Sequence, residues 1–292
     1  MTPTSPTPEP LPPFLAQTSR IGSEISITGK WVPTNKSGLF RRSAESREMV
    51  REWNEIHADA REHSGVLSTE INLGIGEESV LVHHVFRDAE AVRDYFASTA
   101  TNHMEALTRV AKPALHLVRG ASIPDAVRQA LKAKHVPATF GEHLFGYVKN
   151  DHQRPDLANA IMVTAKWTCT DDDAGALDQL THWWQRVGTD AHAIEKGLIR
   201  FEVYRVPGEN ALIIHETFDS TAELQFHLAK GTAHKYKKDI DAIAAPEAYF
   251  FRGPVSWTIR TYSKFLHLPA TYTSQGPQFA RPGGTMSEGT FA

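Results

Sequence analysis

The chain repeats one long pattern. Ala-Leu-Ile-Ile-His-Glu-Thr-Phe at 211–218 follows the pattern of Ser-Val-Leu-Val-His-His-Val-Phe at 79–86, and Tyr-Phe-Phe-Arg-Gly at 249–253 follows that of His-Leu-Val-Arg-Gly at 116–120. Nearly the same spacing separates both pairs of segments, and it lies far above the roughly 20–50 residues of solenoid and propeller repeats. The sequence therefore predicts two tandem copies of a whole domain.

The match continues on both sides of these segments. His-Val-Pro-Ala-Thr at 135–139 is repeated as His-Leu-Pro-Ala-Thr at 267–271, and Gly-Lys-Trp at 29–31 is repeated as Ala-Lys-Trp at 165–167. Proline and glycine, which are typical of linkers, gather near both ends of the chain. We predict a flexible arm at 1–23, a first domain at 24–150, a second domain at 151–275 and a flexible tail at 276–292.

Length, charge and cysteine content exclude several classes of function. The 292 residues suit two domains of about 100–150 residues each. The formal charge of −3 leaves no basic excess, so we expect no nucleic-acid partner. A single cysteine, Cys169, excludes an intramolecular disulfide and a paired-cysteine site. No apolar run reaches the roughly 18–20 residues that span a bilayer, and residues 1–10 do not resemble a secretion signal, so we expect a cytoplasmic protein without a membrane partner.

Each copy predicts the order strand, helix, strand, strand, helix, strand. In the second copy, strands are predicted at 160–167, 198–204, 211–218 and 247–252, and helices at 175–192 and 220–243. In the first copy, strands are predicted near 25–32, 66–73, 79–86 and 115–119. This order is that of the ferredoxin-like fold, in which both helices cover one face of an antiparallel sheet. The expected fold class is α+β with two tandem ferredoxin-like domains.

The helix-free face of each sheet needs cover, and the other copy offers a matching sheet. We therefore predict that the two domains pack sheet to sheet as an intramolecular α+β barrel with ligand space between them. Successive strand residues face opposite sides, so the apolar positions indicate which side chains enter that space. Leu212 and Phe218 are predicted to face the helices, so His215 is predicted to face the barrel interior. By the same alternation Phe201 faces the helices and Glu202 the barrel.

A glutamate and a histidine of the second copy are the candidate catalytic pair. Glu202 and His215 lie on adjacent antiparallel strands and share the predicted barrel face, where neighbours are about 5–8 Å apart. A carboxylate at that distance can orient an imidazole as a base. Arg200 and Tyr204 share the face and can hold an anionic oxygen. The alternative interpretation is a structural pair that keeps the two sheets in register.

The remaining candidates are predicted to bind substrate. Glu70 and His83 repeat the glutamate–histidine pair in the first copy. Proline follows two residues after the histidine in each repeated tail, which indicates extended loops whose histidines close the mouth of each pocket. The predicted substrate-binding residues are Lys30, Glu70, Asn72, His83, His135, Lys166 and His267.

The histidines also raise the question of a metal site. Glu70, His83 and His116 together have the composition of a His/carboxylate set for non-haem iron. The second copy has Tyr249 in place of His116, and no His-Xaa-His spacing occurs on these strands. We therefore expect neither a metal nor a cofactor.

One segment of the second copy resembles a known family signature. Glu-Thr-Phe-Asp-Ser-Thr-Ala-Glu-Leu-Gln-Phe-His-Leu at 216–228, followed by His234, resembles the Glu-Xaa-Trp motif and two helical histidines of the antibiotic biosynthesis monooxygenase domain family. Glu216 stands at the family glutamate, Phe218 at its aromatic position, and His227 and His234 at the histidines. The family consists of small ferredoxin-like proteins that pair into a dimeric α+β barrel.

The first copy departs from this signature. His84 stands at the position of the glutamate and Tyr95 at that of the first histidine, so the resemblance does not imply an identical site there. The repeated His-Xaa-Pro-Ala-Thr tails lie outside the resemblance.

The resemblance implies a cofactor-independent monooxygenase that oxidises an aromatic or quinol-like small molecule with O2. A base deprotonates a phenol in a dry pocket, and the resulting anion reduces O2 directly. Because other barrels of the wider superfamily differ in function, two alternatives stand: a haem-binding or haem-degrading barrel, and a non-oxidative small-molecule-binding, isomerase or lyase barrel. The expected partners are the aromatic substrate and O2, and the outer helices leave room for a homodimer.

Overall fold

The structure is a computed structural model that describes residues 11–16, 22–35, 43–98, 100–149, 160–171, 174–274 and 278–280. It is a mixed α+β protein. The chain divides into two compact units: an amino-terminal unit of residues 19–142 and 272–292, and a carboxyl-terminal unit of residues 143–271 and 1–18. Among the described residues, no helix combines the length and the apolar character needed to cross a membrane.

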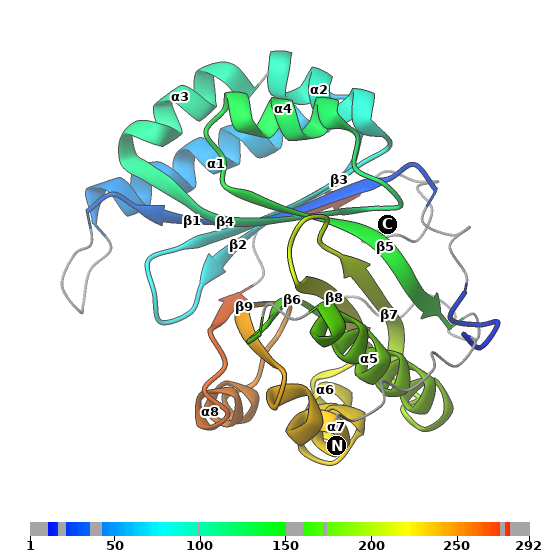
Figure 1. Ribbon diagram of the computed structural model, residues 1–292. Coiled ribbons are helices and arrows are strands. Elements are labelled where there is room, and N and C mark those ends of the chain that lie inside the picture. Colours follow the sequence, from blue (N-terminus) through cyan, green and yellow to red (C-terminus); the bar gives the residue numbers. More distant parts are fainter. Residues whose placement is uncertain are drawn as a thin grey trace. The chain divides into compact units, whose positions relative to one another are not determined.

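The amino-terminal unit is built around one mainly antiparallel sheet. Its elements are β1 (Ile25–Pro33), α1 (Ala44–Glu62), β2 (Val66–Gly74), β3 (Val80–Phe86), α2 (Ala89–Ser98), α3 (Ala100–Val110), β4 (Ala111–Gly120), α4 (Asp125–Ala133), the first half of β5 (Ala138–Val148), the end of β10 (Ala270–Ser274) and β11 (Gln278–Ala280). The central strands follow the order β4-β1-β3-β2. β5 runs parallel to β4, and β10 and β11 pair with β2. The helices lie on one face of this sheet (Figure 1).

The carboxyl-terminal unit repeats this plan. Its elements are β6 (Ile161–Cys169), α5 (Ala174–Ile194), β7 (Leu198–Arg205), β8 (Ala211–Phe218), α6 (Thr221–Ala229), α7 (Thr232–Asp241), β9 (Ala244–Arg252) and α8 (Trp257–Phe265), with the second half of β5 and the start of β10. The central strands follow the equivalent order β9-β6-β8-β7. β10 lies beside β9, and β5 beside β7. Again the helices cover one face of the unit's own sheet (Figure 1).

Strand register confirms the cross-strand pairs that the sequence predicts. Glu202 is the partner of His215 across β7 and β8, and Glu70 is the partner of His83 across β2 and β3. The alternation of faces is also confirmed. Phe218 contacts the His227 ring on α6, with 5.1 Å between the ring centroids, so its side of β8 faces the helices.

The core of each unit lies between its sheet and its helices. In the amino-terminal unit, α1 shows how the sequence builds this layer. The Ser43 hydroxyl caps the helix by accepting a hydrogen bond of 3.0 Å from the Ser46 amide. Met49, Trp53 and Ile56 then follow at helical spacing and are buried. Their burial supplies most of the stabilisation of such a helix, because helix propensity alone contributes little.

Two predictions about local structure are wrong. The helix expected over 220–243 is two helices, because the chain breaks at Lys230 and Gly231. The repeated tails are not simple extended loops, since each histidine ends a helix, α4 or α8. His135 and His267 both adopt φ of 55°, and the amide of each next residue returns to the helix, at Leu131 and Ser263. This pattern is a Schellman helix end, in which the left-handed residue satisfies the last carbonyl groups.

Gly29 of β1 leaves room for a neighbouring side chain. A β-carbon at this position would lie 2.0 Å from Cδ2 of His116, so the ring would have to move. We predict that Gly29→Ala lowers the free energy of unfolding by about 1–3 kcal/mol, the usual cost of overpacking. Ala165, at the same position of the repeat, already carries a β-carbon. The variant Ala165→Ser is the control, and equal urea midpoints for both variants would show that His116 moves freely.

Candidate active site

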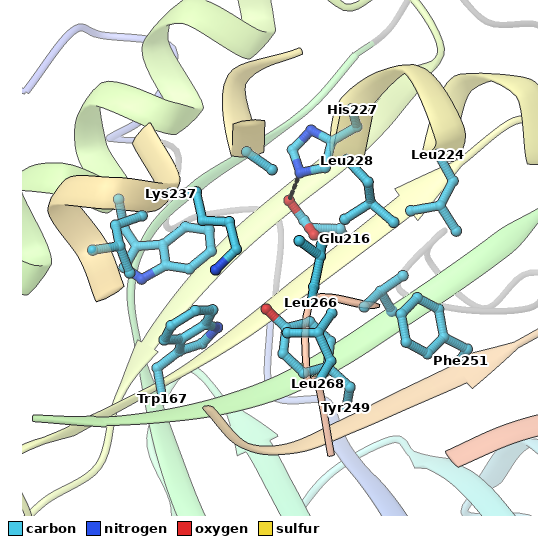
Figure 2. Close-up of a pocket in the computed structure, with 14 residues that line it drawn as sticks. Trp167, Glu216, Leu224, His227, Leu228, Lys237, Tyr249, Phe251, Leu266 and Leu268 are labelled. Atoms are coloured by element: carbon cyan, nitrogen blue, oxygen red, sulfur yellow. Dashed lines mark ion pairs between the residues drawn. The ribbon is translucent and has the colours of Figure 1, made fainter. Parts of the chain in front are cut away.

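A cavity lies between the sheet and the helices of the carboxyl-terminal unit. It opens to solvent, and the empty space within it and at its mouth together is about 590 Å³. Side chains of β6, β8 and β9 form its floor, and residues of α5, α6, α7 and the end of α8 form its walls (Figure 2). The lining residues are Val163, Trp167, Trp184, Glu216, Leu224, His227, Leu228, Ala233, Lys237, Ile240, Tyr249, Phe251, Leu266 and Leu268.

Glu216 brings a carboxylate into this mainly apolar space. It lies on β8 between Ile214 and Phe218, and strand alternation gives all three the helix side of the sheet. Figure 2 shows its carboxylate among His227, Lys237 and Tyr249. The Glu216 side chain is 6% exposed, and its Oε1 atom has no hydrogen-bond partner among the described residues. That oxygen is open to a hydrogen bond from a ligand.

His227 of α6 links Glu216 to a second buried carboxylate. Nε2 of His227 lies 3.3 Å from Oε1 of Glu216, and Nδ1 lies 2.7 Å from Oε2 of Glu195. Glu195 follows directly after α5 and is 2% exposed. The imidazole therefore lies between two carboxylates. A protonated imidazole neutralises part of their charge, which is required when carboxylates are buried.

The break between α6 and α7 holds Glu195 in place. Its Oε1 accepts hydrogen bonds from the amide and the hydroxyl of Thr232, at 2.6 and 2.7 Å. Thr232 is the first residue of α7, so the carboxylate caps this helix and meets the positive end of its dipole. A β-carbon at Gly231 would lie 2.6 Å from the same oxygen. The glycine thus permits the close approach of Glu195.

Burial and mutual contacts set the ionisation of the three groups. Burial raises the pKa of Glu216, and His227 opposes this rise without cancelling it. Burial lowers the pKa of His227, but the charge of Glu216 and the hydrogen bond to Glu195 outweigh it and raise that pKa. For Glu195, burial is outweighed by the contacts with His227 and Thr232, so its pKa is lowered. The arrangement favours an ionised Glu195, a protonated His227 and a Glu216 that is more basic than usual.

The residues predicted as catalytic occupy the other face of the same sheet. Oε1 of Glu202 accepts a hydrogen bond of 2.7 Å from Arg200, and Oε2 accepts one of 2.7 Å from Tyr204. Nδ1 of His215 is hydrogen-bonded to the Thr164 hydroxyl at 3.0 Å. Glu202 therefore faces His215 across the strands and acts on it through charge, while the Thr164 hydroxyl is the group hydrogen-bonded to the ring.

The first-copy residues form a similar arrangement in the amino-terminal unit. Nδ1 of His83 is hydrogen-bonded to the Thr28 hydroxyl at 2.8 Å, just as His215 is bonded to Thr164. Glu70 is the cross-strand partner of His83, and Asn72 lies two residues further along β2. The Thr–His contact is thus part of the repeat.

The predicted lysines and tail histidines lie elsewhere. Lys30 forms an ion pair of 2.8 Å with Glu77, and Lys166 forms ion pairs of 2.7 Å with Glu209 and 2.9 Å with Glu247. His135 and His267 are exposed at their helix ends. The residues after them, Val136 and Leu268, line the cavity of their own unit instead. The repeated tails therefore reach the cavities through apolar side chains.

No metal site emerges from the histidines. His116 faces the helix side of β4, where Trp31 donates a hydrogen bond of 3.0 Å to its Nε2. Glu70 and His83 lie on the opposite face, so the three do not converge. Within the part of the chain that the structure describes, no group of three His, Cys, Asp or Glu side chains is placed to hold a metal ion.

The sequence analysis does not identify Glu195, and it names Glu216 and His227 only through the family resemblance. The family resemblance named Glu216 and His227, and these two line the cavity. It also named His234, which lies exposed on α7. No sequence pattern marks Glu195 as a site residue, because it lies in the turn after α5 and contacts His227 only in the folded chain. A carboxylate in such a turn is normally solvent-exposed.

Comparison with known proteins supports the fold. No model of a protein family matches the sequence, and no curated protein matches it. A candidate monooxygenase from Fusobacterium nucleatum is similar over 77% of this chain and 90% of its own, with 10% identity and a TM-score of 0.50. A candidate monooxygenase from Lactobacillus acidophilus is similar over 78% and 91%, with 14% identity and a TM-score of 0.46. SnoaB from Streptomyces nogalater, a cofactor-independent oxygenase, is similar over 35% and 97%, with 14% identity and a TM-score of 0.29. The first similarity establishes a shared fold and nothing of the activity.

Proposed function

We propose that the carboxyl-terminal unit is a monooxygenase that oxidises a hydroxyaromatic small molecule with O2 and needs no cofactor. One observation carries this proposal: a mainly apolar cavity contains a carboxylate, Glu216, whose pKa is raised by burial and whose Oε1 contacts the His227 imidazole. Trp167, Trp184 and Tyr249 provide flat walls for an aromatic ring.

Glu216 is the base in this mechanism. Its Oε1 accepts the proton of the substrate hydroxyl, and its raised pKa makes it a stronger base than an exposed glutamate. His227, held protonated by Glu195, lies beside Glu216 and stabilises the resulting phenolate through its charge, whereas the Lys237 ammonium forms an ion pair with Asp241. The apolar walls exclude water, which strengthens these charge interactions.

The electron-rich phenolate then reduces O2. One electron passes to O2, and the two radicals combine to form a carbon–peroxide bond at the ring carbon para to the oxygen. Glu216 returns its proton to the peroxide. Loss of the proton from that carbon then breaks the O–O bond, and the departing hydroxide takes up a proton to become water. The ring becomes a quinone with one oxygen atom from O2, so that a phenol and O2 give a quinone and water. The substrate supplies all four electrons.

A second candidate site lies on the helix-free face. Arg200 and Tyr204 hold Glu202 beside His215, an arrangement in which His215 is the base. This hypothesis places the substrate in a barrel formed by sheet-to-sheet packing of tandem ferredoxin-like domains, which stays a prediction from the sequence. The cytoplasmic location and the homodimer likewise stay predictions.

The cavity also bears on the alternatives. A haem iron needs one free imidazole nitrogen, and both ring nitrogens of His227 face carboxylates. An isomerase or lyase uses the same base but consumes no O2. Oxygen uptake therefore separates the proposed reaction from non-oxidative chemistry.

Neighbouring residues of β8 give a test of the two sites. We predict that Glu216→Gln lowers substrate-dependent O2 uptake by roughly 10²–10⁴-fold, the usual contribution of a positioned base. His215→Gln changes the residue directly before Glu216, whose side chain points to the helix-free face of the sheet. This variant should keep most of the O2 uptake. The measurement uses metal-free protein, an oxygen electrode and a panel of phenols and naphthols.

The reverse result would assign the base to His215 and reject the helix-side cavity. Uptake that follows the iron content of the preparation would reject the cofactor-free mechanism. Conversion of a substrate without O2 uptake would favour the isomerase or lyase alternative.

The pairing of His227 with Glu195 predicts a pH-dependent stability. The pKa of His227 is raised in the folded protein. Its contribution to the free energy of unfolding is therefore complete below about pH 6.5, the pKa of a free histidine, and is lost as the pH rises through the pKa of the folded state. We predict that His227→Gln lowers the free energy of unfolding by about 3 kcal/mol at pH 6, since it leaves Glu195 unpaired. The loss should be smaller at pH 9.

Urea unfolding at the two pH values measures this difference. His234→Gln is the matched control, because His234 is exposed on α7. This substitution should lower the free energy of unfolding only slightly at either pH. An equal loss for His227→Gln at both pH values would show that the imidazole is not charged in the folded protein.

A further inference from the structure

The amino-terminal unit has a cavity of its own at the equivalent place. It lies between the sheet and the helices and opens to solvent. Its lining residues are Ile27, Trp31, Trp53, Ile56, Val82, His84, Tyr95, Phe96, Met104, His116, Leu131 and Val136. None of these is an acidic residue, a lysine or an arginine.

The charged groups of the other cavity are replaced here one by one. At the spacing of the repeat, His84 stands for Glu216, Tyr95 for His227, and His63 for Glu195. His84 and Tyr95 remain in contact, with ring centroids 5.7 Å apart, and Tyr95 also contacts the His63 ring at 5.7 Å. The duplicated fold thus keeps the positions of the three groups and changes their chemistry.

The replacements leave the cavity without charge. Burial lowers the pKa of His84 to about 3, and nearby histidines add to the effect. Burial also lowers the pKa of His116 to about 3. Burial raises the pKa of Tyr95, so its hydroxyl keeps its proton. Near neutral pH all three side chains are uncharged, and a charged ligand would find no counter-charge to offset its desolvation.

Four polar atoms of the residues that line the cavity have no hydrogen-bond partner among the described residues. They are Nε1 of Trp53, Nε2 of His84, Nδ1 of His116 and the hydroxyl oxygen of Tyr95. These residues are only 4%, 5%, 4% and 2% exposed, so bulk water does not reach them. The rings are adjacent, with the Trp53 and His84 centroids 6.1 Å apart. Buried polar atoms without partners are costly, and a ligand that bonds to them recovers that cost.

The fixed His116 ring completes one wall. An indole N–H only donates, so the bond from Trp31 makes Nε2 of His116 an acceptor and places the imidazole proton on Nδ1. Gly29 provides the space in which the ring lies. His116 is thereby held as a neutral, oriented ring, and both His116, through Nδ1, and His84, through Nε2, keep a nitrogen for other partners.

We propose that this cavity is a second binding site, specific for an uncharged aromatic molecule that carries a hydroxyl or carbonyl oxygen. The oxygen accepts a hydrogen bond from Trp53, which can only donate, and Tyr95 and His84 complete its contacts. Trp31, Trp53 and Phe96 hold the ring. The site lacks the acid–base group of the carboxyl-terminal unit, so it binds the ligand without removing its proton.

Indole N–H resonances report binding at each cavity separately. Trp53 lines the amino-terminal cavity and Trp184 the carboxyl-terminal one, and Trp→Phe variants assign the signals. We expect 2-naphthol to shift the Trp53 resonance, and naphthalene-2-sulfonate, with the same rings and a negative charge, to leave it in place. Tyr95→Phe removes one oxygen and keeps the shape. It should weaken 2-naphthol binding at Trp53 by about tenfold, the typical effect of one buried hydrogen bond, and leave the binding measured at Trp184 unchanged.

Several outcomes would overturn the proposal. These are a Trp53 resonance that 2-naphthol does not shift, equal shifts with the sulfonate, or unchanged affinity in Tyr95→Phe. A haem absorption band that disappears in His84→Phe would assign the cavity to haem instead. Because binding is measured without turnover, each result is independent of whether the carboxyl-terminal unit oxidises a substrate.

Discussion

The burial of Glu195 is the constraint on which the carboxyl-terminal site depends. A carboxylate removed from water requires hydrogen bonds and a counter-charge. Thr232 supplies the hydrogen bonds from the first turn of α7, and His227 supplies the charge from α6. The chain must break between these helices, and Gly231 permits the break because a larger residue would meet the carboxylate. The orientation of His227, and through it the contact with Glu216, follows from this single buried group.

The two units share a strand order but differ in the chemistry of their cavities. Both units build a cavity from the same strands and helices, and the equivalent residues occupy equivalent places in its wall. In one unit, Glu216 and His227 give it acid–base character. In the other, His84 and Tyr95 are buried and uncharged. A scaffold fixed by apolar packing can accept such exchanges, since function depends on the few polar groups that enter the cavity.

The two faces of β8 carry two different arrangements. Glu216 faces the helices and the cavity, whereas His215, the residue before it, meets Thr164 on the opposite face. The His–Thr contact recurs as His83 with Thr28, while the charged cavity does not recur. A feature kept in both copies suits a structural role common to both sheets, and a feature present in one copy suits a specialised activity. This contrast favours Glu216 over His215 as the base.

The sequence by itself determined the repeat, the strand order within each copy and the alternation of faces, because these follow from periodic apolar residues and local pairing. It therefore placed Glu202 opposite His215 correctly. It did not reveal that His135 and His267 end helices, since proline two residues later is compatible with either structure. Only the tertiary structure brought Glu195 to His227, because a turn residue and a helix residue meet through packing that no sequence period encodes. The tertiary structure also decided the ionisation of Glu195, Glu216 and His227, since burial and neighbouring charges set the pKa of each group.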